Sequence, residues 1–400
     1  MNEERFVLRD EPFGYTLFDK QKMRHKFLAR GSLPEELCFD DIRVNSYEKL
    51  DADLNGALDD IIFSPIRMYF ELTSACNLRC KTCFNQSGKP KPDELTTEEV
   101  KKTLKGFRND NVFDVRFSGG ELTARSDWFE LLKYAKDLGF SVSFNTNGVY
   151  RNHEDTVEKI VSLNADQVAI SIDGGKDFHN YIRSNSTFEK AVKTLKDLHK
   201  KGTHLRINTV LTRGSGNDLE EILELASQYV EEINFFYMRT AGRALDILDQ
   251  VMTYDELLAF DEKIEPYKAK YPHVNILHGA KVLAINSIDK IKKNNVGLKM
   301  GGPDGFTRFN ILPNGSIWPG GYTPHLRPEF YLGNIKDEGY TLLNIWRNSP
   351  ELKRFREISL KLQEDCYECP EKGVKCVGAS MEMEFYRQLD SANTNPYCKY

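Results

Sequence analysis

The chain has no run of about 18 consecutive apolar residues, the least that a membrane-spanning helix needs. It also has no excess of basic residues, because 55 Lys and Arg stand against 60 Asp and Glu, and the formal net charge is -5. Such a chain lacks the positive surface that binds nucleic acid. The stretch MNEERFVLRD is polar and acidic where a signal peptide would be basic and then apolar. We therefore expect a cytoplasmic protein that binds neither membranes nor nucleic acid.

Cysteine is scarce but unevenly placed. Of the eight cysteines, seven fall into two groups and Cys38 stands alone. In a reducing compartment such grouping is typical of metal ligation rather than of disulfide bonds. The first group is Cys76, Cys80 and Cys83, and the second is Cys366, Cys369, Cys376 and Cys398.

The first group lies in ELTSACNLRCKTCFNQSG and places three thiolates in one tight loop after a predicted strand. A 4Fe-4S cluster normally takes four cysteine ligands, so a loop that supplies three leaves one iron free to bind something other than protein. A structural zinc site is the alternative, but zinc needs four closed ligands. No fourth Cys or His lies nearby, and the nearest downstream histidine is His153. We therefore favour an iron-sulfur cluster with one open iron.

Between residues 64 and 240, short β-branched and aromatic runs alternate with amphipathic stretches, which is the βαβα pattern of a parallel sheet. Helices are marked by the capping box from Thr96 to Glu99 and by the stretch from Phe188 to Lys200, which ends at Gly202. The pattern predicts an α/β fold whose strands are residues 66–73, 112–118, 140–146, 167–173, 204–211 and 233–239.

The unusual residues of this region follow the predicted strands. The three cysteines follow the first strand, and Gly119-Gly120-Glu121 follows the second. The turn Asn145 to Gly148 closes the third strand, and Ser171 to Gly174 closes the fourth. In parallel α/β barrels the C-terminal ends of the strands carry function. We therefore expect these residues to lie together on one rim.

These motifs, in this order and spacing, resemble those of the radical S-adenosylmethionine (SAM) enzymes over residues 64–245. The family signature is CX3CX2C, and the family core is a partial (β/α)6 TIM barrel. The resemblance implies that the amino and carboxylate groups of SAM chelate the open iron. It also implies that an electron from the cluster breaks a sulfur-carbon bond of SAM, and that the resulting 5'-deoxyadenosyl radical removes a hydrogen atom from the substrate.

The resemblance further implies roles for single residues. Glu121 would accept a hydrogen bond from the SAM ammonium group, and Arg183 would pair with the SAM carboxylate. Thr82 and Leu122 depart from the family pattern, which bears on the adenine contacts and not on the chemistry. With the ribose and adenine positions included, the implied cofactor-binding set is Gly119, Gly120, Glu121, Asn145, Ser171, Asp173, Arg183, Val210 and Gly242. The implied catalytic residues, which bind the cluster, are Cys76, Cys80 and Cys83.

The second cysteine group lies in DCYECPEKGVKC and NPYC, and four thiolates would close either a cluster or a zinc site. The phrases ILPNGSIWP, LGNI and LLNIW before it resemble the SPASM extension of peptide-modifying radical SAM enzymes. The full SPASM pattern has two auxiliary clusters, but Gly320 and Ser380 stand where further cysteines are expected. We therefore predict one auxiliary cluster, and two 4Fe-4S clusters in all, with auxiliary ligands Cys366, Cys369, Cys376 and Cys398.

The N-terminal segment predicts a three-stranded β-meander over residues 5–28, with turns at 12–14 and 20–22. An open edge of this sheet could accept a peptide strand, or the meander could simply cover the N-terminal end of the barrel. The segment is similar to N-terminal pieces of peptide-maturing radical SAM enzymes and only weakly similar to a PqqD-type leader-recognition domain. A separate PqqD-like recognition protein would then supply that function.

The predicted division is an N-terminal β-meander and linker (1–60), a radical SAM partial TIM barrel (61–250), a helical linker (251–300) and a SPASM-like iron-sulfur domain (301–400). The resemblance implies an enzyme that crosslinks, epimerises or excises a fragment from a ribosomally synthesised precursor peptide, with an electron donor such as flavodoxin or ferredoxin. Two alternatives stay open. One is a radical SAM enzyme for a small molecule such as a sugar or a porphyrin, and the other is a non-catalytic iron-sulfur protein.

Overall fold

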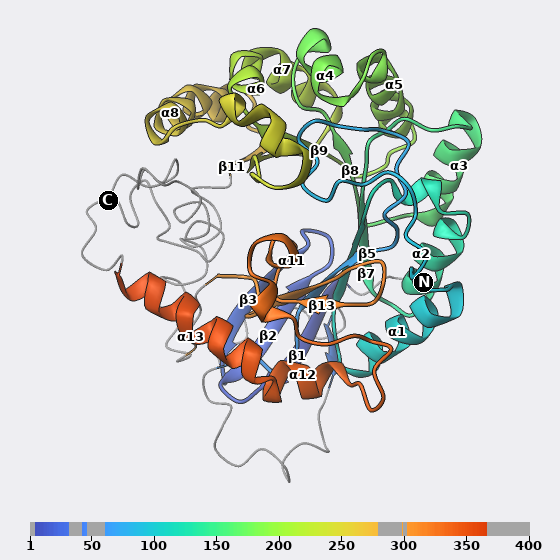
Figure 1. Cartoon of the computed structure of the whole chain (residues 1–400), viewed down its shortest axis with the longest axis vertical. Coiled ribbons are helices and arrows are strands. Elements are labelled where there is room, and N and C mark those ends of the chain that lie inside the picture. Colours follow the sequence, from blue (N-terminus) through green and yellow to red (C-terminus); the bar gives the residue numbers. More distant parts are fainter. Residues whose placement is uncertain (1–4, 32–41, 46–60, 279–297, 299–301, 366–400) are drawn as a thin grey trace.

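The structure is a computed structural model that describes residues 5–31, 42–45, 61–278, 298 and 302–365 (Figure 1). Five cysteines of the sequence predictions therefore lie outside the described residues: Cys38, Cys366, Cys369, Cys376 and Cys398. Within the described part, no helix is both long and apolar enough to cross a membrane.

A parallel sheet forms the centre of the molecule, and all the strands predicted between residues 64 and 240 are present in it. They are β5 (Arg67–Glu71), β6 (Asp114–Ser118), β7 (Ser141–Thr146), β8 (Gln167–Ser171), β9 (Leu205–Leu211) and β10 (Glu232–Tyr237). Each pairs in parallel with the next in chain order. In Figure 1 the helices that connect them lie along the outer side of the curved sheet. The predicted partial TIM barrel is confirmed.

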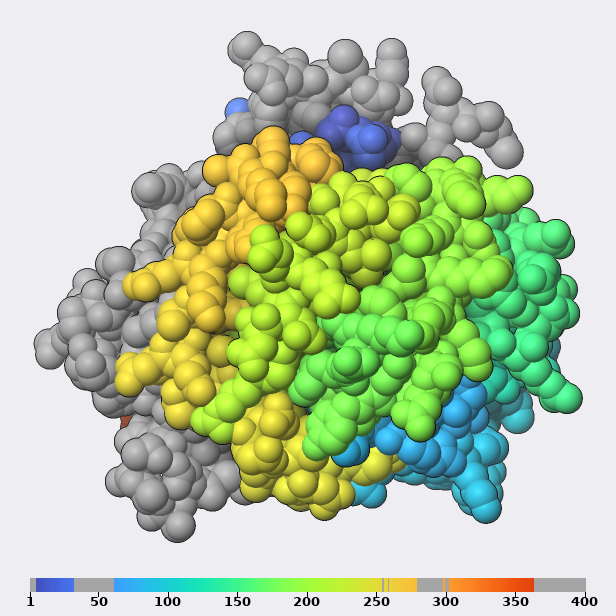
Figure 2. Space-filling model, turned by 90° about the horizontal axis from the view of Figure 1, so that it is seen from above, coloured from blue at the N-terminus to red at the C-terminus, as the bar shows by residue number. Residues whose placement is uncertain are grey.

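The connecting helices bury one face against the sheet. In α1, Val100, Leu104 and Phe107 are buried, and the predicted capping box of Thr96 and Glu99 is present at its first turn. Figure 2 shows the green and yellow helical segments as a continuous outer surface. The helices are α1 (Thr97–Asn109), α2 (Trp128–Asp137), α3 (His153–Leu163), α4 (Lys176–Arg183), α5 (Thr187–Lys200), α6 (Arg213–Asn217) and α7 (Leu219–Tyr229), with the short 3-10 helix η2 (Leu122–Ala124) before α2.

The strands alternate between apolar and polar residues. Four side chains of these strands are completely buried and pack under the helices: Met68 and Phe70 of β5, and Val115 and Phe117 of β6. The residues between them point to the other face because successive side chains of a strand alternate. That inner face carries polar side chains, such as Arg67, Tyr69 and Glu71 of β5. The barrel interior is therefore polar, whereas its wall is an ordinary apolar core.

Three further strands extend the sheet beyond the predicted set. β11 (Asn275–His278) adds to β10 in parallel, β12 (Arg308–Ile311) adds to β5 in parallel, and β13 (Ile317–Trp318) adds to β12 antiparallel. These strands have two to four residues, too few for the alternation of apolar and polar residues to identify them. The segment predicted as a helical linker thus holds η3 (Gly242–Gln250) at its border, α8 (Tyr254–Lys270) and one strand. The division of the chain into four parts stays a prediction.

The C-terminal part packs against the β12 edge. Trp346 is 0% exposed, its ring lies 4.8 Å from that of Phe309, and its Nε1 donates to the carbonyl of Ile62 at 2.8 Å. This contact ties the C-terminal helices to the start of the barrel. These elements are α11 (Thr323–Leu326), η4 (Pro328–Phe330), α12 (Leu342–Asn348) and α13 (Pro350–Asp365).

The N-terminal meander is confirmed as β1 (Phe6–Glu11), β2 (Gly14–Asp19) and β3 (Arg24–Ala29), and β4 (Ile42–Asn45) adds to β1 in parallel. The sheet covers the N-terminal end of the barrel. Phe18 packs on Phe113, just before β6, at 5.6 Å, and Arg67 donates to the carbonyl of Met23 at 3.0 Å. β4 occupies one edge of this sheet, and β3 is the outer strand on the other.

Candidate active site

The cysteine loop leaves the C-terminal end of β5 and is held by its backbone. The Cys76 N–H donates to the carbonyl of Gly88 at 2.9 Å, and the Gly88 N–H donates to the carbonyl of Ser74 at 2.8 Å. The thiols of Cys76, Cys80 and Cys83 are free and half-buried. The loop is therefore closed by main-chain bonds, which leaves its three sulfurs available as ligands.

The segment after β10 also contacts the cysteine loop and donates hydrogen bonds to it. Gly242 has φ +59°, and a Cβ there would collide with the carbonyl of Phe84. The next residue, Arg243, donates from its N–H to the Cys83 carbonyl at 3.1 Å and from Nε to the Cys80 carbonyl at 2.8 Å. The structure thus places Gly242 against the backbone of the cysteine loop. Its predicted position beside adenine stays a prediction.

The three thiols are chemically suited to an iron-sulfur cluster, which takes one thiolate per iron. In the part of the chain that the structure describes, no three His, Cys, Asp or Glu side chains are arranged to hold a single metal ion. Burial raises the pKa of Cys76 to about 11 and also raises the pKa of Cys80. Both would therefore be thiols without a metal, and a bound metal would deprotonate them.

The turn Gly119-Gly120-Glu121 lies directly beside this loop. The Gly120 N–H donates to the carbonyl of Thr73 at 2.7 Å, and the Glu121 N–H donates to that of Ala75 at 2.8 Å. Gly119 has φ +134°, and a Cβ on either glycine would collide with the backbone of residues 73–75. Both glycines are therefore required by the close approach of two main chains, and their predicted role in cofactor binding stays a prediction.

Glu121 is 1% exposed, and protein donors surround its carboxylate. It accepts from the Asn147 N–H at 2.7 Å, from Thr123 Oγ1 at 2.9 Å and from Thr146 Oγ1 at 3.0 Å. Burial raises the pKa of this carboxyl, and the hydrogen bonds oppose that rise. Asn147 in turn donates to Asn77 Oδ1 in the cysteine loop at 2.8 Å. Glu121 thus joins the loop after β7 to the cluster loop, and its predicted contact with the SAM ammonium group stays a prediction.

Asp173 and Arg183 form a buried ion pair next to the cysteine loop. Arg183 Nε donates to Asp173 Oδ2 at 2.7 Å, and Arg183 Nη1 lies 3.9 Å from Cys80 Sγ. The other oxygen of Asp173 accepts from the Val210 N–H at 3.0 Å. Burial lowers the pKa of Arg183, but Asp173 and Cys80 raise it more, so the guanidinium stays charged. Arg183 therefore presents a fixed positive charge to a predicted cluster ligand.

The remaining predicted residues also reach this rim. Asn208 Nδ2 of β9 donates to Asn145 Oδ1 of β7 at 3.0 Å, and Ser171 of β8 is the register partner of Asn208. Ser171, Asn145 and Val210 are half-buried. The structure thus brings all the predicted residues of the described part to the C-terminal ends of neighbouring strands.

Sequence reasoning missed a second polar group on this rim. Glu71 is 8% exposed and accepts from Asn310 Nδ2 and Asn85 Nδ2, both at 3.0 Å. Burial raises its pKa, which makes it a candidate proton carrier. His325 Nε2 lies 2.9 Å from Asn85 Oδ1 and extends the group. The sequence pattern that could have identified Glu71 is the alternation of polar residues along β5, where every second side chain is charged or carries a hydroxyl group.

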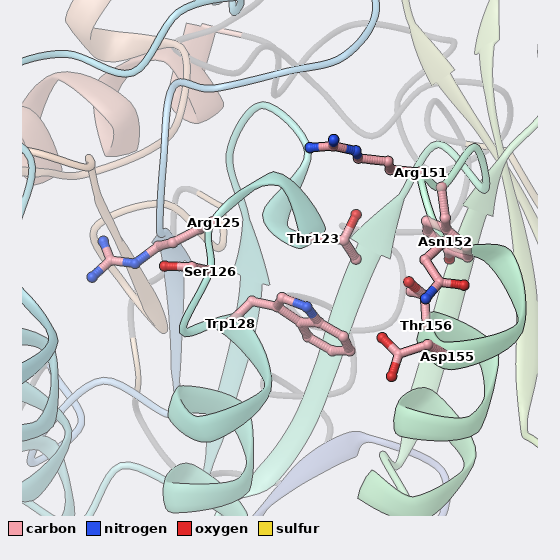
Figure 3. A pocket seen from close by; sticks show the side chains of 9 residues that line it. Thr123, Arg125, Ser126, Trp128, Arg151, Asn152, Asp155 and Thr156 are labelled. Carbon is pink, nitrogen blue, oxygen red and sulfur yellow. The ribbon is translucent and has the colours of Figure 1, made fainter.

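A cavity of about 350 Å³ lies outside the barrel, between the start of α2 and the start of α3 (Figure 3). In Figure 3, Trp128 and Asp155 face one another across it, and Arg125 and Arg151 lie at opposite sides. None of the predicted site residues lines it, and it is separate from the cysteine loop. Its lining residues are Thr123, Arg125, Ser126, Trp128, Tyr150, Arg151, Asn152, Asp155 and Thr156.

Two families match the chain. Residues 70–226 match the radical SAM superfamily, and residues 303–370 match the SPASM iron-sulfur cluster-binding domain. The first match covers β5 to α7 with the cysteine loop, and the second covers β12 to α13 and extends to the first cysteines of the second group.

Relatives cover most of the chain. The mycofactocin maturase MftC of Mycolicibacterium smegmatis is 30% identical over 345 residues, which are 84% of this chain and 83% of that protein. An AdoMet-dependent heme synthase of Methanosarcina barkeri is 27% identical over 84% of this chain and 97% of that protein. Among solved structures, Streptococcus suis SuiB bound to S-adenosylmethionine superposes with a TM-score of 0.73 and 16% identity, over 99% of this chain and 98% of SuiB.

The geometry of the cysteine loop and of the glycine turn beside it is consistent with the family that these similarities indicate. The predicted cofactors belong to the matched families, because radical SAM proteins use a 4Fe-4S cluster with SAM and the SPASM domain binds further iron-sulfur clusters. The chain belongs to the radical SAM superfamily and is an enzyme of that family with a SPASM iron-sulfur domain.

Proposed function

We propose that this enzyme modifies a ribosomally synthesised precursor peptide through a 5'-deoxyadenosyl radical. The observation that carries the proposal is the 30% identity to the mycofactocin maturase across 84% of the chain. Two further similarities support it: 29% identity over 172 residues to the sporulation killing factor maturation protein SkfB of Bacillus subtilis, and the fold of SuiB, which has been solved with its precursor peptide SuiA. The bond that is changed, whether by crosslinking, epimerisation or excision, is left open.

The residues at the barrel rim have distinct tasks in this proposal. Cys76, Cys80 and Cys83 would hold the cluster, which together with SAM supplies the radical. Arg183, 3.9 Å from Cys80 Sγ, stabilises the thiolate form of that ligand and is placed to pair with an anionic group at the open iron. Glu121 fixes the loops after β6 and β7 through four short contacts, so that the rim keeps its shape when a ligand binds.

The second cluster is also part of the proposal. Four cysteines would satisfy it completely, so it offers no open iron and serves electron transfer or the fold of the C-terminal part. Two clusters predict about eight irons per chain, with four per cluster, in anaerobically purified protein. About twelve irons per chain would instead indicate a third cluster. The proposed ligands are Cys366, Cys369, Cys376 and Cys398.

Two partners besides the peptide are proposed. A flavodoxin or ferredoxin would deliver the electron, and a PqqD-like protein would present the leader of the peptide. The N-terminal sheet is firmly attached to the barrel, and its outer strand β3 is the edge at which a leader strand could add. A pull-down of the leader with and without the partner protein distinguishes these two routes.

Coexpression tests the proposal. The enzyme is produced with each short peptide encoded beside its gene, and the peptide is analysed by mass spectrometry. We expect a mass change that requires SAM and disappears in the Cys80→Ala variant. An unchanged peptide, together with 5'-deoxyadenosine formation, would contradict peptide modification while leaving radical chemistry intact.

A second candidate is supported by the similarity to AdoMet-dependent heme synthases, which covers 97% of one such protein. The substrate would then be a porphyrin rather than a peptide. Anaerobic incubation with SAM, reductant and a propionate-bearing iron porphyrin would yield a product of lower mass if this candidate is correct. An unchanged porphyrin beside a modified peptide would exclude it.

A further inference from the structure

Four arginines project into the barrel interior from the first three residues of their strands, well below the rim. Arg67 of β5, Arg116 of β6, Arg206 of β9 and Arg308 of β12 all stand on inward-facing strand positions around Tyr69. Arg116 is the direct register partner of Tyr69, and the Arg308 guanidinium lies 5.0 Å from the Tyr69 ring centre. Tyr69 is two residues, or about 7 Å, below the rim residue Glu71.

Two of the inward residues on the strands between Arg116 and Arg206 are small, and the two that pair with them, Gln167 and Asn145, are polar. Ser143 of β7 is the register partner of Arg116, and Ala169 of β8 is that of Arg206. Burial lowers the pKa of Arg206 to about 10, Glu232 opposes this shift, and the charge of Arg116 adds to it. The two guanidinium groups therefore lie within electrostatic range of one another.

Within the described residues, the four arginines share their carboxylate partners. Arg67 pairs with Asp114, Arg308 with Asp304, and Arg206 with Glu232 at 3.3 Å. The Nε of Arg116 lies 3.6 Å from Asp114, a carboxylate that Arg67 already engages. Arg116 therefore has no carboxylate of its own among the described residues.

Two donors in this layer also lack an acceptor among the described residues. The Nε of Arg206 and the Nε of Arg116 are buried without a hydrogen-bond partner there, and the Arg206 side chain is only 7% exposed. Leaving a buried charged donor unsatisfied costs stability, and an anion that accepts from it removes that cost. The arrangement resembles a prepared binding site more than a structural ion-pair network.

The charges of these arginines also change the pKa of Tyr69. Burial alone would raise the pKa of its phenol, but Arg116, Arg308, Arg67 and Arg206 lower it to about 7. A tyrosine is normally neutral at this pH. The layer therefore stabilises a negative oxygen at its centre.

Part of this layer is exposed among the described residues. Phe236 of β10 is 41% exposed although it stands on a central strand position, and its ring lies 5.4 Å from the Arg206 guanidinium. The side chains of Arg116 and Arg308 are 16% and 21% exposed. The interior is thus not filled by the described side chains, and an apolar surface adjoins the arginines.

We propose that Arg116, Arg206 and Arg308 form a carboxylate-binding subsite in the barrel interior, and that the substrate presents a carboxylate there. This rests on the proposed function, because it assigns the barrel interior to the substrate. Guanidinium groups bind carboxylates through paired hydrogen bonds with defined geometry, which would fix the substrate below the rim at which the radical forms. The carboxylate comes either from the C-terminus of a peptide or from an Asp or Glu side chain.

Two isomeric probes distinguish these sources. N-acetylglutamine carries only an α-carboxylate, N-acetylisoglutamine carries only a side-chain carboxylate, and N-acetylglutamine amide is the neutral control. Binding to the anaerobic holoenzyme with SAM is measured by ligand-observed NMR. We expect at least one acid to bind about tenfold more tightly than the neutral amide, and the preferred isomer identifies the source.

Variants place the effect in the arginine layer. Arg206→Gln should remove the preference for the acid, and Arg116→Gln should do the same if the first variant does not fold. The surface control Arg213→Gln, whose side chain is 40% exposed, should keep the preference. The EPR spectrum of the reduced cluster shows that each variant is folded.

Equal binding of acids and amide by the wild-type holoenzyme would overturn the proposal, as would no binding of either acid up to about 20 mM. A preference that survives Arg206→Gln and Arg116→Gln would overturn it too. None of these measurements uses a precursor peptide. Failure here therefore differs from failure of the proposed function, which is an unmodified peptide in the coexpression experiment.

Discussion

The two ends of the barrel bury charged groups in opposite ways. At the N-terminal end, Arg9 is 0% exposed, and its guanidinium donates to Glu11 at 2.7 Å, to Ser64 Oγ at 2.6 Å and to three carbonyl groups. At the C-terminal end, three thiols stand free, and in the interior between the two ends the Nε of Arg206 is buried without an acceptor in the described residues.

This difference distinguishes buried polar groups that stabilise the fold from those that are available to bind a ligand. A buried ion that is completely hydrogen-bonded holds the molecule together, and nothing further can bind to it. A buried donor or thiol that the protein leaves open costs stability, and the fold tolerates that cost where a ligand compensates for it. The N-terminal end is therefore a structural closure, and the rim with the layer below it is the working part.

Replacing a cysteine of the rim should have the largest effect on chemistry. In Cys80→Ala the cluster loses one of three ligands, and formation of 5'-deoxyadenosine from SAM and dithionite should fall below about 1% of wild type. The thermal unfolding of the metal-free protein should hardly change. Chromatography of the nucleoside measures the first, and calorimetry of the apo-protein measures the second.

Cys38→Ala is the matched control, because Cys38 stands outside both cysteine groups. It should retain wild-type nucleoside formation. Substantial 5'-deoxyadenosine from Cys80→Ala would contradict the assignment of this loop as the cluster loop.

Replacing Arg9 at the N-terminal end of the barrel should instead lower the free energy of unfolding. Arg9→Ala leaves the buried Glu11 carboxylate without its cation, and we expect a loss of about 3–5 kcal/mol in the free energy of unfolding. Denaturant unfolding measures it. Arg5→Ala removes a pair with Asp19 whose arginine side chain is 42% exposed, and it should cost at most about 1 kcal/mol. Equal losses in the two variants would contradict the distinction drawn between the two ends.

Arg183→Gln should have an intermediate effect that is specific to the cofactor. It removes a charged donor from Asp173 and from the neighbourhood of Cys80, and a charged hydrogen bond contributes about 1.5–3 kcal/mol. The Kd of SAM should therefore rise by about 10- to 100-fold, measured by equilibrium dialysis. Arg213→Gln serves as the surface control. A wild-type Kd in Arg183→Gln would exclude the predicted pairing with the SAM carboxylate.

The smallest expected effect is a change in the pH at which one tyrosine, Tyr69, loses its proton. The pKa of Tyr69 at about 7 predicts that one tyrosine loses its proton near neutral pH, visible by NMR of ring-labelled tyrosine and absent in Tyr69→Phe. Between pH 7 and the ordinary value of 10.0, the unfolded chain binds a proton that the folded chain has released, so this group makes the folded state more stable as pH rises. If every tyrosine titrates above about 9, the interior field is weaker than proposed.

Much of the barrel could be predicted because its signals are local. The capping box of Thr96 and the six apolar runs are contiguous in sequence, and the rule that function gathers at the C-terminal ends of strands placed the cysteines, the glycine turn and Asp173 on one rim. The N-terminal meander was readable for the same reason. Its turns and alternation lie within 30 residues.

The parts that were missed depend on contacts between distant segments. β12 is a strand only because Arg308 to Ile311 pair with β5, about 240 positions earlier in the chain. Gly242 gives no sign in the sequence that it lies against Phe84. The arginine layer requires the register of β5, β6, β9 and β12 together. Each arginine by itself is indistinguishable from a solvated side chain, and only the polar alternation along each strand indicated that the interior is charged.

Radical formation in this enzyme requires that the cysteine loop leaves one iron open and that SAM binds there. The most direct measurement is electron-nuclear double resonance on the reduced, anaerobic enzyme with SAM that carries 15N in its amino group. We expect a 15N coupling to the cluster that is present in the wild type and lost in Cys80→Ala. A reduced cluster in the wild type that shows no such coupling at saturating SAM would contradict it.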